Sequence, residues 1–377
     1  MCKKSSRTKS TSIPRCGWPK RKRTARSRRK IINKGARRMS KAYRIAVIGT
    51  GAMGKKHVEG WQLAGHRVVS VTDINLQSAK EVADKFGVGE VYADYKESIA
   101  RPDIDIVSIC LPLKFHAPVT VFAAGQGKHV FCEKPLTGST EQANEMVAAI
   151  REAGVQFGIG FQRSYALDAE LFTQYVQEGK LGRPVLFNSE NLMEVRPKIA
   201  MHDYYGNMGP VMDVCCHSFF LWRTVFRSRA KFAYASGRIF AKDRQELVSL
   251  EKLAIDTASI TVEYESGDVG AMTVSWGLPA KTKLRSRCPD RVIGPEGAVE
   301  AAGGGKWNVF IGSGTETVQL ESGNLHEKQF AQFARCLDYG TPYPIGLREG
   351  REILALTEAV FRSIEAGSSV QVVYDFD

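Results

Sequence analysis

The sequence predicts an α/β protein in two parts: an N-terminal, doubly wound parallel sheet and a C-terminal α/β domain with an open, mainly antiparallel sheet. Three observations predict this fold. A glycine-rich turn at residues 49–54 joins a β-branched run to a helical pattern. Short apolar runs and amphipathic segments then alternate to about residue 161. Beyond residue 165, longer runs alternate apolar and polar residues, which is typical of strands with one exposed face.

The first strand, residues 45–48, enters the turn Gly49-Thr50-Gly51-Ala52-Met53-Gly54, which has the pattern G-x-G-x-x-G. Gly49 permits the tight turn, Gly51 permits close approach of a pyrophosphate, and Gly54 lets the following helix pack closely on the strand. The alternative is a glycine-rich turn that binds no ligand.

The second strand, residues 68–72, ends at Asp73, which lies 19 positions after Gly54. A carboxylate at this distance can accept hydrogen bonds from the hydroxyls of an adenosine ribose. The order of strand, turn, helix, strand and acid therefore predicts a dinucleotide-binding unit. NAD is the expected cofactor because a carboxylate repels a ribose 2′-phosphate, and NADP stays possible because Lys80 lies nearby in the sequence.

The remaining elements follow the same two patterns. In the first part we expect strands at 91–93, 106–111, 130–132 and 155–159, and helices at 77–86, 117–124 and 141–153. In the second part we expect a helix at 169–178, strands at 184–191, 231–240, 259–265 and 270–276, and closing helices at 327–337 and 348–366. The predicted domains are therefore a basic tail at 1–42, a dinucleotide-binding domain at 43–162 and a substrate-binding and oligomerisation domain at 163–377.

The net charge of +13 comes from the tail. Residues 1–44 hold 18 lysines and arginines and no acid, so the rest of the chain holds 35 basic and 40 acidic side chains, a net charge of −5. A segment of this composition cannot bury a core and is expected to be disordered. It could bind nucleic acid or another polyanion, serve as a transit peptide, or result from a start codon upstream of a true start at Met39. The last interpretation is favoured, which makes nucleic acid an unlikely partner.

Membrane insertion and a disulfide framework are both disfavoured. No run of 18 apolar residues is present, and none of the eight cysteines forms a C-x-x-C pair. This cysteine usage is typical of a reducing compartment, so a cytoplasmic location is expected.

Two later motifs carry side chains suited to catalysis. Glu133-Lys134-Pro135 directly follows a predicted strand, and residues at the carboxyl ends of parallel strands face the ligand crevice. Lys134 could there stabilise a developing alkoxide, or could be a solvated loop lysine. Asp213 and His217 lie four residues apart in a stretch with helical character, 211–225, so we expect them to share one helix face as a proton-transfer pair. The alternative is a capping acid and a core histidine.

A metal site is not expected. Cys215, Cys216 and His217 are adjacent, but neighbouring residues point to different faces of a helix, and no other cluster has zinc-ligand spacing.

From about residue 43 to the C-terminus, the ordered set of motifs resembles the Gfo/Idh/MocA family of glucose–fructose oxidoreductases and inositol dehydrogenases. The resemblance implies a Rossmann domain followed by an α/β domain with an open, mainly antiparallel sheet. It also implies Lys134, Asp213 and His217 as the catalytic set. The cofactor residues that the motifs and the resemblance indicate are Gly49, Thr50, Gly51, Ala52, Met53, Gly54, Asp73, Leu111, Pro112, His116, Glu133 and Lys134.

Two departures from the family pattern concern the site. Leu111-Pro112-Leu113 replaces the family's T-P-N, so a polar side chain expected near the nicotinamide is missing. Phe220 stands where the family often has an acid, which makes that part of the pocket more apolar.

The resulting hypothesis is an NAD(P)-dependent oxidoreductase that transfers a hydride between nicotinamide and a secondary alcohol or ketone of a sugar, cyclitol or related compound. Such an enzyme would have a small-molecule substrate, no membrane partner, and a homodimeric or homotetrameric assembly. Two alternatives stay open: a non-catalytic NAD(P)-binding sensor or scaffold, and an NAD-dependent glycoside hydrolase of the same fold.

Overall fold

The computed structural model describes residues 41–282, 284, 290–321 and 323–376. These residues belong to one compact unit, Ser40–Asp377. The sequence predictions for the basic tail and for Met39 lie outside the described residues.

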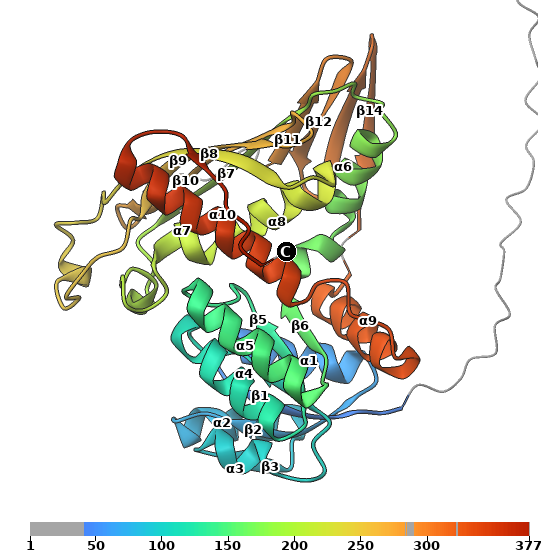
Figure 1. Ribbon diagram of the computed structural model, residues 1–377, viewed down its shortest axis with the longest axis vertical. Helices are drawn as coiled ribbons and strands as arrows, with labels where there is room; N and C mark the ends of the chain where they lie inside the picture. Colours follow the sequence, from blue (N-terminus) through green and yellow to red (C-terminus); the bar gives the residue numbers. More distant parts are fainter. Residues whose placement is uncertain (1–40, 283, 285–289, 322, 377) are drawn as a thin grey trace, which may run out of the picture. The chain divides into compact units, whose positions relative to one another are not determined.

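Six parallel strands form the first sheet of the described chain, in the order β3-β2-β1-β4-β5-β6 (Figure 1). Their bounds are β1 Arg44–Ile48, β2 Arg67–Thr72, β3 Glu90–Tyr92, β4 Ile106–Ile109, β5 His129–Glu133 and β6 Phe157–Gly160. The strand order reverses between β1 and β4, and a crevice opens beyond the carboxyl ends of strands at such a switch point. The predicted doubly wound parallel sheet is confirmed.

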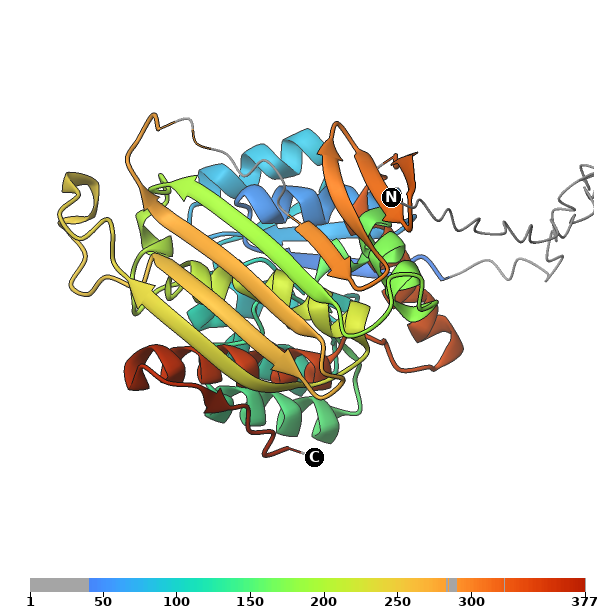
Figure 2. The ribbon, with the colours of Figure 1, turned by 90° about the horizontal axis from the view of Figure 1, so that it is seen from above.

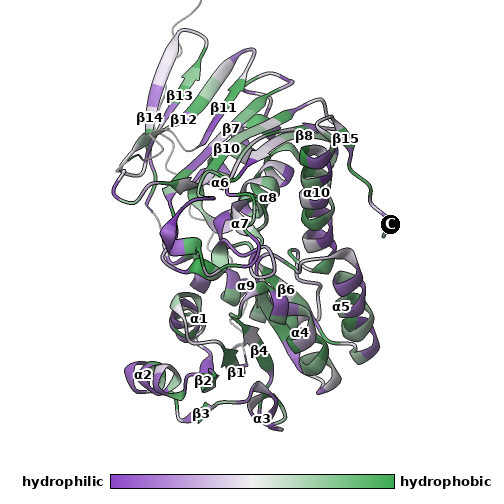
Figure 3. Ribbon diagram, turned by 90° about the vertical axis from the view of Figure 1, so that its left-hand side faces the viewer, coloured by the Kyte–Doolittle hydropathy of each residue, from purple (hydrophilic) through white to green (hydrophobic). Residues whose placement is uncertain are grey.

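Five helices connect these strands: α1 Ala52–Leu63, α2 Leu76–Phe86, α3 Tyr95–Ile99, α4 His116–Gly125 and α5 Thr140–Ala153. Their ends follow local chemistry. The side chain of Asn75 accepts a hydrogen bond from the backbone of Ser78 at the start of α2, and Gly87, with φ +67°, ends that helix. The sheet strands are apolar, and β1 and β4 are coloured hydrophobic in Figure 3. Strands buried on both faces need such continuous apolar runs.

The second sheet of the described chain has nine strands in the order β14-β13-β12-β11-β7-β10-β9-β8-β15. β7 and β10 pair in parallel, and the other neighbours are antiparallel. Their bounds are β7 Leu186–Glu194, β8 Ala230–Arg238, β9 Thr257–Tyr264, β10 Val269–Leu278, β11 Asp290–Gly294, β12 Gly297–Gly303, β13 Lys306–Ile311, β14 Gly314–Gln319 and β15 Val370–Gln371. The prediction of an open, mainly antiparallel sheet is confirmed.

Four helices of this part lie on one face of the nine-stranded sheet, as the view onto its other face in Figure 2 shows. They are α6 Leu167–Gln177, α7 Gly209–Asp213, α8 Cys215–Phe226 and α10 Leu347–Ala366. The helix α9 Leu325–Tyr339 packs instead against α1 of the first part, where Phe330 stacks on Trp61. Along β9, Ala258, Ile260, Val262 and Tyr264 are buried and the residues between them are exposed. This alternation is the physical reason why the sheet is covered by helices on one side. No helix within the described residues is both long and apolar enough to cross a membrane.

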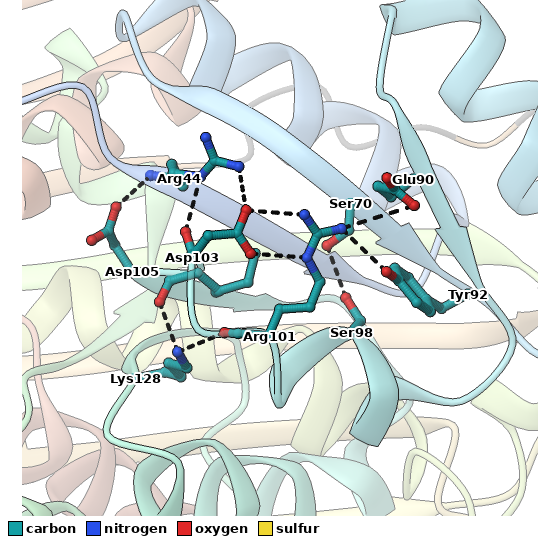
Figure 4. Close-up of polar contacts among 10 residues, drawn as sticks. Arg44, Ser70, Glu90, Tyr92, Ser98, Arg101, Asp103, Asp105 and Lys128 are labelled. Carbon is teal, nitrogen blue, oxygen red and sulfur yellow. Dashed lines mark hydrogen bonds and ion pairs between the residues drawn. The ribbon is translucent and has the colours of Figure 1, made fainter.

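A charged network joins the amino-terminal ends of the parallel strands (Figure 4). Arg44 and Arg101 both contact the carboxylate of Asp103, and the backbone N–H of Arg44 donates to Asp105 at 2.8 Å. Lys128, just before β5, donates to two backbone carbonyls of the same loop at 2.8 and 3.0 Å. The network lies at the edge opposite the crevice, so it supports the sheet and leaves the carboxyl ends of the strands for the site.

The structure contains elements that the sequence pattern does not predict: α3 in the first part, and β11 to β15 in the second. Most residues of β14 are exposed on both faces, so its sequence lacks the alternation of apolar and polar residues that would predict a strand. Several glycines also interrupt the β12–β14 region. Pairing with neighbouring strands, and not local pattern, determines the strands β11 to β15.

Candidate active site

The glycine-rich turn joins β1 to α1 at the crevice end of the parallel sheet. Gly49 has φ +96°, and a Cβ there would lie 2.5 Å from the carbonyl oxygen of Cys110. A Cβ at Gly54 would lie 1.9 Å from the carbonyl oxygen of Gly49, whereas one at Gly51 would meet no atom within 4 Å. Open space therefore lies beside the start of α1, whose first N–H groups have no side-chain cap. This arrangement fits a pyrophosphate.

The carboxylate of Asp73, at the end of β2, is fixed against the same turn. Its Oδ2 accepts hydrogen bonds from the backbone N–H and the hydroxyl of Thr50, both at 2.9 Å, and its Oδ1 accepts from the backbone of Asn75 at 3.0 Å. Ala52 and Met53 form the first turn of α1 beside it. The acid and the turn are thus brought together as the spacing predicts, and contact with a ribose stays a prediction.

Lys134 directly follows β5, and the structure brings it to Asp213. Its Nζ donates to the backbone carbonyl of Asp213 at 2.7 Å and lies 3.5 Å from Oδ1 of the same residue. The two side chains are 13% and 12% exposed. Burial acts to lower the pKa of Lys134, but Asp213, Cys216 and Glu133 together outweigh burial and raise this pKa. An ammonium has three N–H donors, so one is left for a substrate oxygen.

The expectation of one continuous helix over 211–225 is wrong. α7 ends at Asp213 and α8 begins at Cys215, with Val214 at φ −110° between them. The physical reason is that the carbonyl of Asp213 accepts from Lys134 and from the thiol of Cys216 at 3.3 Å. The backbone N–H of His217 donates instead to Val214 at 3.1 Å. Asp213 and His217 therefore belong to two helices and do not share one helix face.

His217 stands apart from Asp213. The structure shows no hydrogen bond between the side chains of these two described residues; the Asp213 carboxylate instead accepts from Asn207 at 3.3 Å and faces Lys134. Burial lowers the pKa of His217 well below its ordinary value, and the charges of Lys134 and Arg163 add to this effect. Its Nδ1 is buried and has no partner within the described part of the chain. Buried polar atoms of this kind usually find a partner in a ligand or water.

Comparisons with known proteins identify the family of both parts of the chain. The sequence profile of the Gfo/Idh/MocA oxidoreductase family, described as having an NAD-binding Rossmann fold, matches residues 43–161. The profile of the Gfo/Idh/MocA C-terminal domain matches residues 171–300. The chain belongs to the Gfo/Idh/MocA family.

Among relatives of this family, the uncharacterized oxidoreductase YrbE of Bacillus subtilis is 32% identical over 232 residues, which cover 61% of this chain and 66% of that protein. Myo-inositol 2-dehydrogenase of Thermotoga maritima is 26% identical over 232 residues, covering 61% and 67%. These alignments thus span about two thirds of the relatives' own lengths. A solved structure of levoglucosan dehydrogenase with NADH and levoglucosan has a TM-score of 0.78 at 20% identity, covering 88% of this chain and 99% of that one. This last similarity shows the fold.

The family membership and the expectation of NAD as cofactor are therefore confirmed, and residues 43–161 form an NAD-binding Rossmann domain. The individual site residues are not tested by these comparisons. Their roles are proposals.

The buried ring of His116 lies between the loops that follow β4 and β5 and contacts the backbone of both. Its Nδ1 lies 2.8 Å from the carbonyl oxygen of Pro135 and its Nε2 lies 2.9 Å from that of Leu111. Burial lowers the pKa of the ring, although both carbonyls act in the opposite direction. Only 1% of His116 is exposed, so the structure favours a role in holding the Leu111-Pro112 and Lys134-Pro135 backbones over direct contact with a cofactor.

Glu133 is likewise buried, at 4% exposure, beneath the loop that carries Lys134. Within the described residues, one group of metal-ligating types comes together: His57, Glu133 and His326, whose ligand atoms lie within 4.8 Å of one another. His57 Nε2 and Glu133 Oε1 already contact each other at 2.8 Å, so a hydrogen bond satisfies both atoms. Cys215 and Cys216 do not belong to this group.

Two further residues at the site escape the sequence analysis. Arg163 follows β6 and is close enough to influence His217, and Asn207 contacts Asp213. The rule that residues after parallel strands face the crevice could have found Arg163. Asn207 lies in a loop before α7, and no sequence signal indicates its contact.

We expect Asp73 to make NAD the better cofactor. The double substitution Asp73→Ser with Ile74→Arg should raise kcat/KM with NADP relative to NAD, because it removes the charge that repels a 2′-phosphate and adds a guanidinium that binds one. Ile74 is 95% exposed, so an arginine fits there without strain. Ile74→Arg alone is the matched control, since it keeps Asp73. Equal or better use of NADP by the unmodified protein would contradict the role of Asp73.

Proposed function

We propose that this protein transfers a hydride between NAD(H) and a secondary alcohol or ketone carbon of a sugar, cyclitol or related compound. The observation that carries the proposal is the contact of Lys134 with Asp213 at the crevice, with His217 close enough for the charge of Lys134 to lower its pKa. The names of relatives support the substrate class: myo-inositol 2-dehydrogenase and scyllo-inositol 2-dehydrogenase among the curated proteins, and levoglucosan dehydrogenase among the solved structures.

In the oxidation direction, each side chain has a distinct role. His217 is neutral at physiological pH because its pKa is lowered, so its imidazole can take the hydroxyl proton of the substrate. Lys134 stays charged because its pKa is raised, and its remaining N–H can stabilise the developing alkoxide. Asp213 holds Lys134 in position through its carbonyl and carboxylate.

The residues of the first domain fit the dinucleotide. Gly51 leaves space for a pyrophosphate, and Asp73 is fixed beside it by Thr50. NAD supplies the acceptor or donor of the hydride at the substrate carbon. The proposal also assigns residues 43–162 to cofactor binding and residues 163–377 to substrate binding and assembly. A homodimer or homotetramer in the cytoplasm belongs to the same proposal.

A substrate screen tests this function. Purified protein is incubated with sugars and cyclitols and with NAD or NADP, and absorbance at the reduced-nicotinamide band is followed. We expect NAD reduction with at least one polyol, and about 100-fold slower reduction with the same polyol by the Lys134→Met variant. NAD that stays bound through purification without net reduction would point instead to a glycoside hydrolase. Binding of NAD with no turnover of any compound would favour the sensor.

The pH dependence of oxidation should reflect the environment of His217. A general base must be unprotonated, so kcat/KM falls as pH decreases through its pKa. Because burial and the cations Lys134 and Arg163 lower this pKa, the acidic limb should lie well below pH 6.5. A pH–rate profile measures the limb, and the His217→Gln variant should lack it. A limb centred at or above pH 6.5 would contradict a neutral, buried His217.

A further inference from the structure

We propose that His57 and Glu133 are positioning residues for Lys134: they hold the lysine at its backbone, while Asp213 holds its ammonium. The inference rests on the proposed function and adds two residues to it. It starts from a continuous set of contacts that runs from α1, through the buried end of β5, to the backbone of Lys134.

Glu133 connects the other two residues. Its Oε1 lies 2.8 Å from Nε2 of His57, and its Oε2 accepts a hydrogen bond from the backbone N–H of Lys134 at 3.2 Å. The fold makes room for this carboxylate, since a Cβ at Gly160 on neighbouring β6 would lie 2.9 Å from Oε1. Each oxygen of Glu133 thus has its own partner, and the carboxylate cannot rotate without losing one of them.

The ring of His57 is fixed on its other side. Its Nδ1 lies 2.8 Å from the hydroxyl of Ser108 on β4, and that hydroxyl accepts from the indole N–H of Trp61 at 2.9 Å. A consistent arrangement of protons has the Ser108 hydroxyl donating to Nδ1 and Nε2–H donating to Glu133. The edge of the ring packs on Phe330, with centroids 4.9 Å apart, and the side chain is fully buried. His57 therefore has one orientation available.

The charge of Glu133 acts on Lys134 as well. Burial acts to raise the pKa of Glu133, but the hydrogen bond from His57 and the nearby Lys134 and His326 outweigh it and lower this pKa. Glu133 is then a carboxylate, and its charge helps Asp213 to raise the pKa of Lys134. Lys134 is held by Asp213 at its ammonium and by Glu133 at its backbone, which limits both its position and its orientation.

A double-mutant cycle tests this inference. His57→Leu should lower kcat about tenfold in the otherwise unmodified protein, because small displacements of a catalytic group are costly. In the Lys134→Met background the same substitution should change kcat by less than about twofold, because the residue it positions is gone. His57→Gln keeps an N–H near the position of Nε2 and should recover kcat to within about threefold. The affinity for NADH should stay unchanged in all these variants.

His326→Gln is the matched control, because His326 also faces Glu133 but its Nε2 has no partner within the described chain. This variant should keep normal kcat. If His57→Leu does not fold, Glu133→Gln replaces it in the cycle: its carbonyl still accepts from His57, but its amide cannot accept from Lys134.

Three results would overturn the inference. An equal loss of kcat in both backgrounds would mean that His57 supports only the fold, and normal kcat in His57→Leu would mean that Glu133 needs no support. Stoichiometric zinc in the purified protein that is lost in His326→Gln would show a metal site in place of a positioning pair. If the proposed function itself is wrong, the result is different: the Lys134→Met variant turns over as fast as the unmodified protein.

Discussion

Replacing Lys134 by Met should lower kcat/KM by about 100-fold or more, which corresponds to about 2.7 kcal/mol of lost transition-state stabilisation. Met keeps much of the side-chain volume and removes the charge. The loss is expected in kcat, since the ammonium acts on the charge that develops on the substrate oxygen. Steady-state kinetics with the best substrate from the screen measure it. Lys85→Met, an exposed lysine at the end of α2, is the control and should behave as the unmodified protein.

The companion substitutions separate the roles in the site. His217→Gln should lower kcat/KM by a similar factor. Asp213→Asn should lower kcat/KM by a smaller factor, because the backbone carbonyl of residue 213 still holds Lys134. Combining Lys134→Met with His217→Gln should cost less than the product of the single effects, since both groups act on one oxygen. The Kd of NADH should change little in each variant. Near-normal turnover in His217→Gln would contradict the mechanism and favour the sensor.

The sequence is most informative where function constrains local structure. The turn Gly49–Gly54 and Asp73 are predicted together because a dinucleotide requires glycines and an acid at a fixed spacing, and the structure places the Asp73 carboxylate on Thr50. The strands buried on both faces are predicted for a similar reason, because each must be apolar throughout. Exposed edge strands such as β14 carry no such constraint, so their pairing follows from neighbours that are distant in sequence.

The catalytic set shows where sequence reasoning stops. The sequence identifies Lys134, Asp213 and His217 as candidates, but it pairs the acid with the histidine because they lie four residues apart. The structure pairs the acid with Lys134, which is 79 positions away in the chain. This long-range contact takes the carbonyl that a continuous helix would use, and the helix breaks at Val214. A tertiary contact thus overrides a local helical preference.

The same contact changes the chemistry expected of the pair. An acid hydrogen-bonded to an imidazole would raise the pKa of the ring and favour its charged form. With Asp213 directed at Lys134, burial and the charges of Lys134 and Arg163 act on His217, and its pKa is lowered. In the proposed mechanism, the two functions are therefore separate: Lys134 keeps its proton and His217 accepts one.

The glycines of the turn should respond in opposite ways to the same substitution. Gly54→Ala should destabilise the fold by about 3 kcal/mol or more, because its Cβ would lie 1.9 Å from a backbone oxygen that cannot move away easily. Gly51→Ala should fold normally, because Gly51 has φ −64° and its Cβ would meet no atom within 4 Å.

The Cβ of Gly51→Ala would, however, occupy the space into which a pyrophosphate must come. We therefore expect this variant to bind NADH at least about tenfold more weakly. Its melting temperature without ligand should stay within about 1 °C of that of the unmodified protein. Calorimetric titration gives the Kd, and thermal unfolding with and without NADH gives both stability and the stabilisation that binding adds. Gly65→Ala, at a turn outside the crevice with φ +87°, is the control: its backbone strain should cost stability and leave the affinity for NADH unchanged. Unchanged affinity in Gly51→Ala would show that the open space beside α1 does not receive the dinucleotide.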